Sequence, residues 1–381
     1  MGAPLNIAFL SYYDPLDRRP WSGTINAIYK AVQKWGEVNW IGPIPKSRFI
    51  GKACNTASKI LFHKKYDYQH SIMYSLNYGR IFNKNLKKRK YDLIVAPAAS
   101  AEMAFLKTDV PIVYVIDVTF AIVNEYYEVY SNILGLSLKE ANLIERSALK
   151  KASVILSSSD WAKQSVIEQY GIDGSKVDVV PFGANTENIP DTAFVSKKQK
   201  SSQCKILFLG VEWERKGGII AFDTLLHLER MGLNAELTVC GCVPPPYFKH
   251  ERMRVIPFLN KTDPKQHAQW CELLRDTDFL LLPTRAEGFG IVFCEANAYG
   301  IPAITTETGG IPSVITNNVN GFMLPLSATG EDFAKVIFEI YSDDNRYKKL
   351  SWTSRETYEK KLNWNVWSQI SRKIVGEKLG I

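Results

Sequence analysis

The chain has 381 residues, of which 46% are hydrophobic and 23% are charged, and its formal net charge at pH 7 is +8. This length predicts two domains, and this composition excludes a disordered or low-complexity protein. The six cysteines form no CxxC pair, which argues against a disulfide framework and a zinc site, and no apolar run is long enough to cross a bilayer. Since the start also lacks a secretion signal, we expect a cytoplasmic protein, or a peripheral one at the inner face of the membrane.

Short β-branched segments alternate with longer amphipathic stretches along the whole chain, which predicts parallel sheets covered by helices on both faces. In the first half, the predicted strands are residues 6–11, 38–42, 91–97, 111–117, 153–159 and 177–183. In the second half, the predicted strands are residues 205–211, 235–241, 253–258, 278–284, 302–307 and 321–326. The predicted fold class is therefore α/β, with two doubly wound, Rossmann-like domains.

Residues 184–203 separate the two halves, because they lose apolar periodicity and are rich in Pro, Ser, Thr and Lys. We interpret this stretch as the interdomain linker and place the domains at residues 1–190 and 191–362. The remaining residues, 363–381, carry tryptophans and isoleucines at helical spacing. We expect them to form a helix that packs back on the first domain.

The positive charge gathers in two clusters of the first half, at residues 63–65 and 84–90. Such clusters are most often solvated helix faces, and the alternative is attraction to anionic lipid headgroups or to an acidic substrate. A nucleic-acid partner is disfavoured, because no helix-turn-helix, finger or RNA-binding signature accompanies the charge.

The stretch PTRAEGFGIVFCEA, residues 283–296, sets two glutamates on either side of a glycine turn. It follows a predicted strand and opens a predicted helix, and open parallel sheets bind their ligands beyond the carboxyl ends of strands. Glu287 falls on the turn and Glu295 on the helix, so we expect both carboxylates to face the same site. Gly288 and Gly290 allow the backbone to approach a ligand closely.

The start of this helix adds a second kind of binding group. The backbone N–H groups near Ile291 and Val292 have no partner within the helix and suit an anion such as phosphate. Carboxylates accept hydrogen bonds from vicinal hydroxyls, so the stretch predicts a ligand that combines sugar diols with phosphate. Each glutamate taken alone is more often a solvated surface residue.

A second strand–turn–helix pattern, FLGVEWERKGG at residues 208–218, places Arg215 and Lys216 beside two glycines. These cations suit a diphosphate, although a surface helix cap is the ordinary reading of such a turn. We identify no Asp-x-Asp pair in the sequence that would hold a divalent ion. We therefore expect that these cations would stabilise a departing diphosphate without a metal.

Residues 283–310 and 317–325 resemble the donor-binding region of the retaining family-4 glycosyltransferases, which have the GT-B fold. They carry that family's EX7E motif and its Gly-Gly turn at Gly309 and Gly310. Further segments resemble other landmarks of the family, namely residues 157–171, 179–185 and 208–218. The resemblance covers nearly the whole chain and is most specific between residues 205 and 326.

The resemblance implies a role for each residue of the motif. Glu287 would bind hydroxyls of the transferred sugar, Glu295 the ribose diol, and Lys216 the diphosphate. The implied backbone contacts to the sugar and the phosphate come from consecutive residues, Gly288, Phe289, Gly290, Ile291 and Val292.

The sequence departs from the family pattern in three places. Val211 follows the strand where relatives often have an arginine, so Arg215 is its expected substitute. The glycine-rich loop of the family is represented by a single glycine, Gly23, which we expect beside the diphosphate. Asp117 and Thr119 stand where many relatives have a histidine, and the sequence leaves open which of them takes its place.

The implied function is transfer of a sugar from a UDP- or GDP-sugar to a glycan, lipid-linked or other hydroxyl acceptor, in cell-surface polysaccharide or glycolipid synthesis. The resemblance implies retention of the anomeric configuration, and we expect no cofactor besides the donor substrate. The candidate catalytic residues are Glu287, Lys216, Arg215 and Asp117. Two alternatives remain: a catalytically impaired subunit that binds nucleotide sugars, and an epimerase or phosphorylase on the same scaffold.

Overall fold

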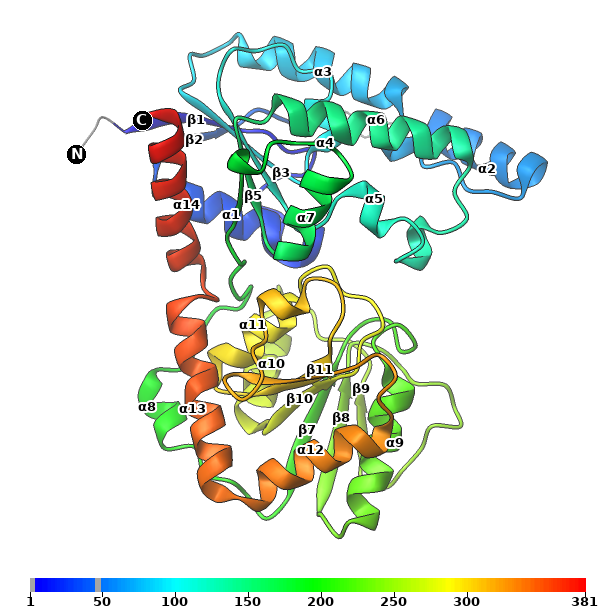
Figure 1. Ribbon diagram of the computed structural model, residues 1–381, viewed down its shortest axis with the longest axis vertical. Helices are drawn as coiled ribbons and strands as arrows, with labels where there is room; N and C mark the ends of the chain where they lie inside the picture. Colours follow the sequence, from blue (N-terminus) through cyan, green and yellow to red (C-terminus); the bar gives the residue numbers. More distant parts are fainter. Residues whose placement is uncertain (1–3, 45–48) are drawn as a thin grey trace. The chain divides into compact units, whose positions relative to one another are not determined.

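The computed structural model describes residues 4–44 and 49–381. These residues form two compact units. The first contains the described residues up to Val180 together with Trp367–Ile381, and the second contains Pro181–Val366. Each unit is built on a six-stranded parallel sheet (Figure 1), so the predicted α/β class with two doubly wound, Rossmann-like domains is confirmed.

In the first unit, the strands lie in the order β2-β1-β3-β4-β5-β6. Their bounds are Leu5–Phe9 for β1, Gly36–Trp40 for β2, Leu93–Pro97 for β3, Ile112–Ile116 for β4, Val154–Ser157 for β5 and Val177–Val179 for β6. β3 and β4 are buried along their whole length, as apolar strands of a covered parallel sheet are expected to be. The strand order reverses at β1, which lies between β2 and β3.

The helices of the first unit connect these strands. These α-helices are α1 Thr24–Val32, α2 Phe49–Phe62, α3 Ile72–Leu86, α4 Ser100–Met103, α5 Phe120–Val123, α6 Gly135–Lys151 and α7 Asp160–Glu168. The last helix of the chain, α14 Trp364–Leu379, belongs to this unit from Trp367 to its end. Short 3-10 turns lie at η1 Pro20–Gly23, η2 Tyr68–His70, η3 Glu128–Tyr130 and η4 Gly174–Lys176.

The last helix, α14, packs on the first unit through two tryptophans. The rings of Trp35 and Trp367 are stacked, with centroids 6.0 Å apart and planes at 11°. The indole N–H of Trp35 donates to the hydroxyl of Ser368 over 2.9 Å, and that hydroxyl donates to the carbonyl of Ala31 over 2.8 Å. The helix expected within residues 363–381 thus begins at Trp364, and these buried contacts attach it to the end of α1.

In the second unit, the strand order is β12-β11-β10-β7-β8-β9. The strand bounds are Cys204–Leu209 for β7, Ala235–Cys240 for β8, Met253–Ile256 for β9, Phe279–Leu282 for β10, Ala303–Thr306 for β11 and Gly321–Leu324 for β12. The helices are α8 Thr192–Ser196, α9 Gly218–Arg230, α10 Pro264–Asp276, α11 Ile291–Ala298, α12 Gly330–Ser342 and α13 Asp344–Lys360, with a 3-10 turn η5 at Ile311–Ser313.

The stretch 184–203, which we interpreted as an irregular linker, lies within the second unit and contains α8. The side chain of Asp191 caps this helix by accepting a hydrogen bond from the N–H of Phe194 over 2.9 Å. A helix of five residues is too short to leave a periodic signal, so its capping residue was the only sign of it. Among the described residues, none of the helices is long and apolar enough to cross a membrane.

Candidate active site

The motifs singled out in the second half lie where the strand order of the second unit reverses. β7 and β10 are hydrogen-bonded neighbours, but the chain continues from β7 to β8 on one side and from β10 to β11 on the other. Open α/β sheets bind ligands beyond the carboxyl ends of strands at such a switch point. The turns after β7 and β10 therefore occupy the expected position of a binding site.

These two turns are fastened to each other by their backbones. The N–H of Arg285 donates to the carbonyl of Arg215 over 2.7 Å, and the hydroxyl of Thr284 donates to the same carbonyl over 3.2 Å. Gly217 has a φ of +78°, and a Cβ there would collide with the carbonyl of Pro283. A glycine is required at this position both by its conformation and by the close approach of the neighbouring turn.

Lys216 and Glu287 form an ion pair across the two turns. Their side chains are about nine-tenths buried, with relative exposures of 10% and 12%. The sequence predicted each residue separately and gave no sign that they would be partners. Because both charges are largely removed from water, the pair fixes the ammonium group beside the glycine turn.

Glu295 is the most deeply buried carboxylate of the motif, with an exposure of 1%. Its Oε1 accepts a hydrogen bond from Nζ of Lys261 over 2.7 Å. Its Oε2 is buried and has no hydrogen-bond partner within the residues that the structure describes. Leaving a buried charged oxygen unsatisfied typically costs at least about 1–3 kcal/mol, so this atom marks a place for a donor group.

Lys261 was missed by the sequence analysis. It follows β9, and its ammonium group lies 4.0 Å from the centre of the Trp270 ring of α10. Trp270 is buried and thereby holds the lysine toward Glu295. No local signal distinguishes Lys261 from an ordinary loop lysine, because its partner is 34 positions away.

The glycine turn between the two glutamates ends at the start of α11. Gly290 caps this helix with a φ of +88°, and a Cβ there would lie 2.5 Å from the Phe293 ring and 3.2 Å from Cγ of Glu287. The first N–H groups of a helix have no intrahelical partner, and here they belong to Ile291 and Val292. Such a helix start attracts anions.

Two more residues of this region lie in the protein interior. Gly288 is buried, and Phe289 is 2% exposed and packs on Phe182 with ring centroids 5.2 Å apart. The N–H of Gly310, in the Gly-Gly turn, donates to the carbonyl of Glu287 over 3.1 Å. The backbone of the glutamate turn is thus held from both sides.

Arg215 braces the glutamate turn. Its guanidinium donates to Glu212 over 2.7 Å and to the carbonyl of Ala286 over 2.8 Å. The hydrogen bond and the positive charge of Arg215 lower the pKa of Glu212. Arg215 therefore contacts Ala286, the residue that directly precedes Glu287.

The candidate residues of the first unit meet around the loop after β1. Trp21, Ser22 and Gly23 have φ values of +50°, +54° and +89°. Two successive non-glycine residues in this region are strained, and such strain concentrates at functional sites. The indole N–H of Trp21 donates to Oδ2 of Asp117 over 2.9 Å.

This arrangement separates the two residues that the sequence left as alternatives. Asp117 is partly exposed and joins the strained loop, whereas Thr119 is fully buried. The Thr119 hydroxyl lies 2.5 Å from the Ser165 hydroxyl in the interior. Of the two, only Asp117 therefore reaches the protein surface.

A cluster of titratable groups that the sequence did not indicate lies in the same unit. Nδ1 of His70 lies 2.7 Å from Oδ2 of Asp67, and burial raises the pKa of Glu102 to about 7 and that of Glu145 to about 6. Burial by itself lowers the pKa of His70, but Asp67 and the two glutamates outweigh it and raise that pKa. This first-unit cluster (Asp67, His70, Glu102 and Glu145) gathers three carboxyl groups around one imidazole.

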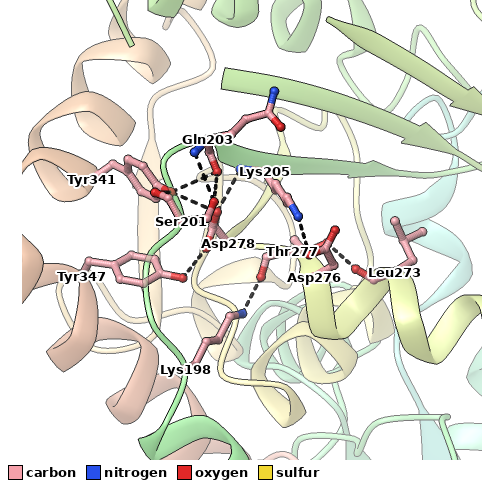
Figure 2. Close-up of polar contacts among 10 residues, drawn as sticks. All are labelled: Lys198, Ser201, Gln203, Lys205, Leu273, Asp276, Thr277, Asp278, Tyr341 and Tyr347. Atoms are coloured by element: carbon pink, nitrogen blue, oxygen red, sulfur yellow. Dashed lines mark hydrogen bonds and ion pairs between the residues drawn. The ribbon is translucent and has the colours of Figure 1, made fainter. Parts of the chain in front are cut away.

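The sequence analysis overlooked one Asp-x-Asp sequence, at Asp276–Thr277–Asp278. Figure 2 shows that its side chains belong to a network of polar contacts. This network lies before β10, whereas Glu287 follows the other end of that strand. Asp278 accepts hydrogen bonds from the Tyr347 hydroxyl over 2.6 Å and from the N–H of Lys205 over 2.9 Å. In the described part of the chain, no group of three or more His, Cys, Asp and Glu residues is arranged to hold a metal.

Two family models match the chain. Residues 45–188 match the model described as Glycosyltransferase Family 4, and residues 193–357 match Glycosyl transferases group 1. Glycogen synthase of Mycobacterium tuberculosis is 23% identical over 282 residues, which cover 72% of this chain and 64% of that protein. D-inositol 3-phosphate glycosyltransferase of Corynebacterium kroppenstedtii is 21% identical over 221 residues, which cover 54% of this chain and 49% of that protein. The chain thus spans about half to two thirds of these curated relatives.

Solved structures resemble the chain over nearly its full length. A glycosyltransferase from Rickettsia africae has a TM-score of 0.66 at 18% identity and covers 98% of each chain. Anabaena HepE in complex with UDP-glucose has a TM-score of 0.64 at 15% identity and covers 99% of this chain and 100% of its own. These matches place the chain among the glycosyltransferases of the GT-B fold, with a Glycosyltransferase Family 4 domain followed by a Glycosyl transferases group 1 domain.

Proposed function

We propose that the chain transfers a sugar from a nucleotide-diphosphate sugar to a hydroxyl acceptor. One observation carries this proposal: Glu295 is buried on α11, about one turn after its start, with one oxygen on Lys261 and the other without a partner in the described residues. A ribose diol supplies the missing donor, and the helix start accepts the phosphates that follow the ribose. HepE, crystallised with UDP-glucose, supports a donor of this class.

The ion pair between Lys216 and Glu287 would open when the donor binds, and each side chain would then contact a different part of the donor. The Lys216 ammonium turns to the diphosphate, and the Glu287 carboxylate accepts hydrogen bonds from the sugar hydroxyls. Both groups are already buried and held by the fastened turns, so little reorganisation is needed at the moment of reaction. Arg215 braces the turn through its hydrogen bond to the carbonyl of Ala286.

The proposed reaction retains the anomeric configuration and uses no metal or further cofactor. The bond from the anomeric carbon to the phosphate oxygen breaks, and its electron pair stays on the diphosphate. The acceptor oxygen bonds to the same face of the sugar, and its proton passes to the leaving phosphate. Glu287 and Glu295 are committed to binding, whereas a double displacement needs a carboxylate free to act as nucleophile.

The proposed acceptor is a glycan or a lipid-linked saccharide used in cell-surface polysaccharide or glycolipid synthesis. A resembling structure, WaaG, is described as a glycosyltransferase involved in lipopolysaccharide biosynthesis, and it has a TM-score of 0.63 at 19% identity over 97% of this chain. The enzyme would act in the cytoplasm, at an anionic membrane surface when the acceptor is lipid-linked.

Calorimetry with UDP, GDP and their sugars tests the donor site directly. We expect the wild-type chain to bind one of these nucleotides, and Glu295→Ala to weaken that affinity about 10- to 100-fold through loss of hydrogen bonds to a charged group. The matched control is Glu251→Ala, an exposed acid of the same unit. Absence of any nucleotide binding by the wild-type chain would refute the proposal.

A further inference from the structure

Helix α2 (Phe49–Phe62) presents its large apolar side chains to solvent. Five of them are more than half exposed: Phe49 at 82%, Ile50 at 59%, Ile60 at 70%, Leu61 at 70% and Phe62 at 58%. Figure 1 shows α2 at the margin of the first unit, away from its sheet. Isolated exposed apolar residues are common, but such a group on one helix marks an interaction surface.

The face of α2 that contacts the protein is formed by small and polar residues. Gly51 is buried, and a Cβ there would collide with the Tyr68 ring. The N–H of Gly51 donates to the Tyr74 hydroxyl over 3.1 Å, and the Ser58 hydroxyl donates to the carbonyl of Lys64 over 2.8 Å. These contacts fix the orientation of the helix, so its apolar face is held outward.

Four of these five side chains lie on one side of α2, with lysines at one edge, and the fifth, Phe62, is the last residue of the helix and lies outside that side. At 3.6 residues per turn, Phe49, Ile50, Ile60 and Leu61 fall within an arc of about 120°. Lys52 and Lys59 lie together next to the Phe49 edge of this arc. An apolar arc bordered by lysines is typical of a helix that lies in the plane of a membrane interface.

The stretch of sequence that contains α2 carries charge of one sign. Residues 38–66 contain six Lys or Arg and no Asp or Glu. The segment that pairs with Lys65 carries two more exposed apolar side chains, Val129 at 71% and Leu136 at 61%. The neighbouring segment also carries exposed Glu125 and Glu128, so the surface is apolar with an excess of basic groups on α2 itself. Such a surface is complementary to a bilayer that contains anionic lipids.

We propose that α2 is the membrane-docking element of this protein and lies at the headgroup level of an anionic bilayer. Phe49, Ile50, Ile60 and Leu61 enter the acyl boundary, and the lysines contact the lipid phosphates. The inference rests on the proposed function in one respect: docking would hold the enzyme at the surface where a lipid-linked acceptor is found. The binding itself needs no donor and no transfer.

Flotation with vesicles tests the proposal on the full chain. We expect binding to vesicles of phosphatidylcholine with phosphatidylglycerol, and much weaker binding to phosphatidylcholine alone or at high salt. I60N/L61N should reduce binding about tenfold or more, and K52Q/K59Q/K64Q roughly fivefold for each lysine removed. All of these side chains are exposed, and circular dichroism shows whether each variant remains folded.

Two controls separate this helix from general stickiness. K87Q/K88Q removes two exposed lysines of the 84–90 cluster, and Tyr247→Asn removes a side chain of the second unit that is 77% exposed. Both should bind vesicles like the wild type. Vesicle binding that is equal in the α2 variants and the wild type overturns the proposal, and so does a wild type that ignores vesicles but forms a dimer that I60N/L61N abolishes.

Nucleotide binding measured on the same variants keeps the two proposals apart. We expect the α2 variants to bind nucleotide with unchanged affinity. Loss of vesicle binding with intact nucleotide binding supports the docking role. A chain that binds vesicles through α2 but binds no nucleotide sustains the docking role and refutes the proposed transfer.

Discussion

Lys261, in the connection that follows β9, neutralises Glu295 of α11 through a hydrogen bond of 2.7 Å. Glu295 is 1% exposed, whereas the Lys261 side chain is 36% exposed and lies over the Trp270 ring. The ammonium group of the pair therefore lies nearer the protein surface, and the carboxylate lies in the interior.

Replacing Lys261 by methionine should remove the cation while keeping the contact with Trp270. We expect a loss of about 1–3 kcal/mol in the free energy of unfolding, because a buried carboxylate loses its partner. Chemical denaturation measures this loss. The double variant K261M/E295Q should recover most of it, and equal losses in the single and double variants would show that the pair does not stabilise the unit.

Lys216→Ala should lower kcat by roughly 10²–10³, the usual cost of removing one group that stabilises developing charge. The measurement is transfer or hydrolysis of the donor at saturating concentration. Lys205→Ala is the control, since Lys205 pairs with Asp276 at the amino end of β10, far along the strand from Glu287. Turnover of Lys216→Ala within a few-fold of the wild type would contradict the assignment.

Gly290→Ala combines two penalties, because φ is +88° and the new methyl would meet Phe293 and Glu287. Gly232→Ala isolates the backbone penalty, because φ is +80° and no other atom lies within 4 Å of its Cβ position. We expect Gly232→Ala to cost about 1 kcal/mol of stability and Gly290→Ala clearly more, with a loss of nucleotide affinity only for Gly290→Ala. Thermal melting and calorimetry on both variants make the comparison, and identical behaviour would exclude a tight packing requirement at Gly290.

The first-unit cluster predicts a pH-dependent stability. Burial raises the pKa of Glu102 to about 7, so the folded state holds a proton that the unfolded state releases near its ordinary value of 4.5. The stabilising contribution of this proton is complete below about pH 4.5 and is lost as the pH rises to about 7. His70 interacts with this carboxyl, and Asp67 and Glu145 interact with His70, so the four groups are linked in their titration.

Glu102→Gln should therefore be more stable than the wild type at pH 8, by roughly 2–3 kcal/mol, and similar to it at pH 4.5. Denaturation midpoints between these pH values provide the measurement. Glu168→Gln, an exposed acid of the same unit, should show no such trend. A Glu102→Gln variant that is destabilised equally at every pH would show that the carboxylate is needed for packing.

The sheets were predictable because buried parallel strands appear in the sequence as short apolar runs between helices. The stretch 278–284, for example, contains β10 at Phe279–Leu282. Pairings across the sheet were not predictable in the same way. Lys216 and Glu287 were each identified from their own turn, but their contact depends on β7 and β10 being neighbours, and the chain forms two other strands between them.

Helix α2 shows a second limit of sequence patterns. Apolar residues at helical spacing normally indicate the face that packs on the core, whereas here that face is exposed and Gly51 and Ser58 face the protein. The sequence analysis noted the basic residues 63–65 and gave no weight to the apolar residues before them. Only the contacts of Gly51 and Ser58 reveal the orientation.

The stacking of Trp35 on Trp367 has a consequence for biosynthesis. The first unit is discontinuous in sequence, because residues of the second unit separate Val180 from Trp367. During translation, the ribosome must therefore complete the second unit before the first can bury Trp35. A nonsense mutation before codon 367 would leave an exposed indole on the early part of the chain, a ready target for chaperones and proteases.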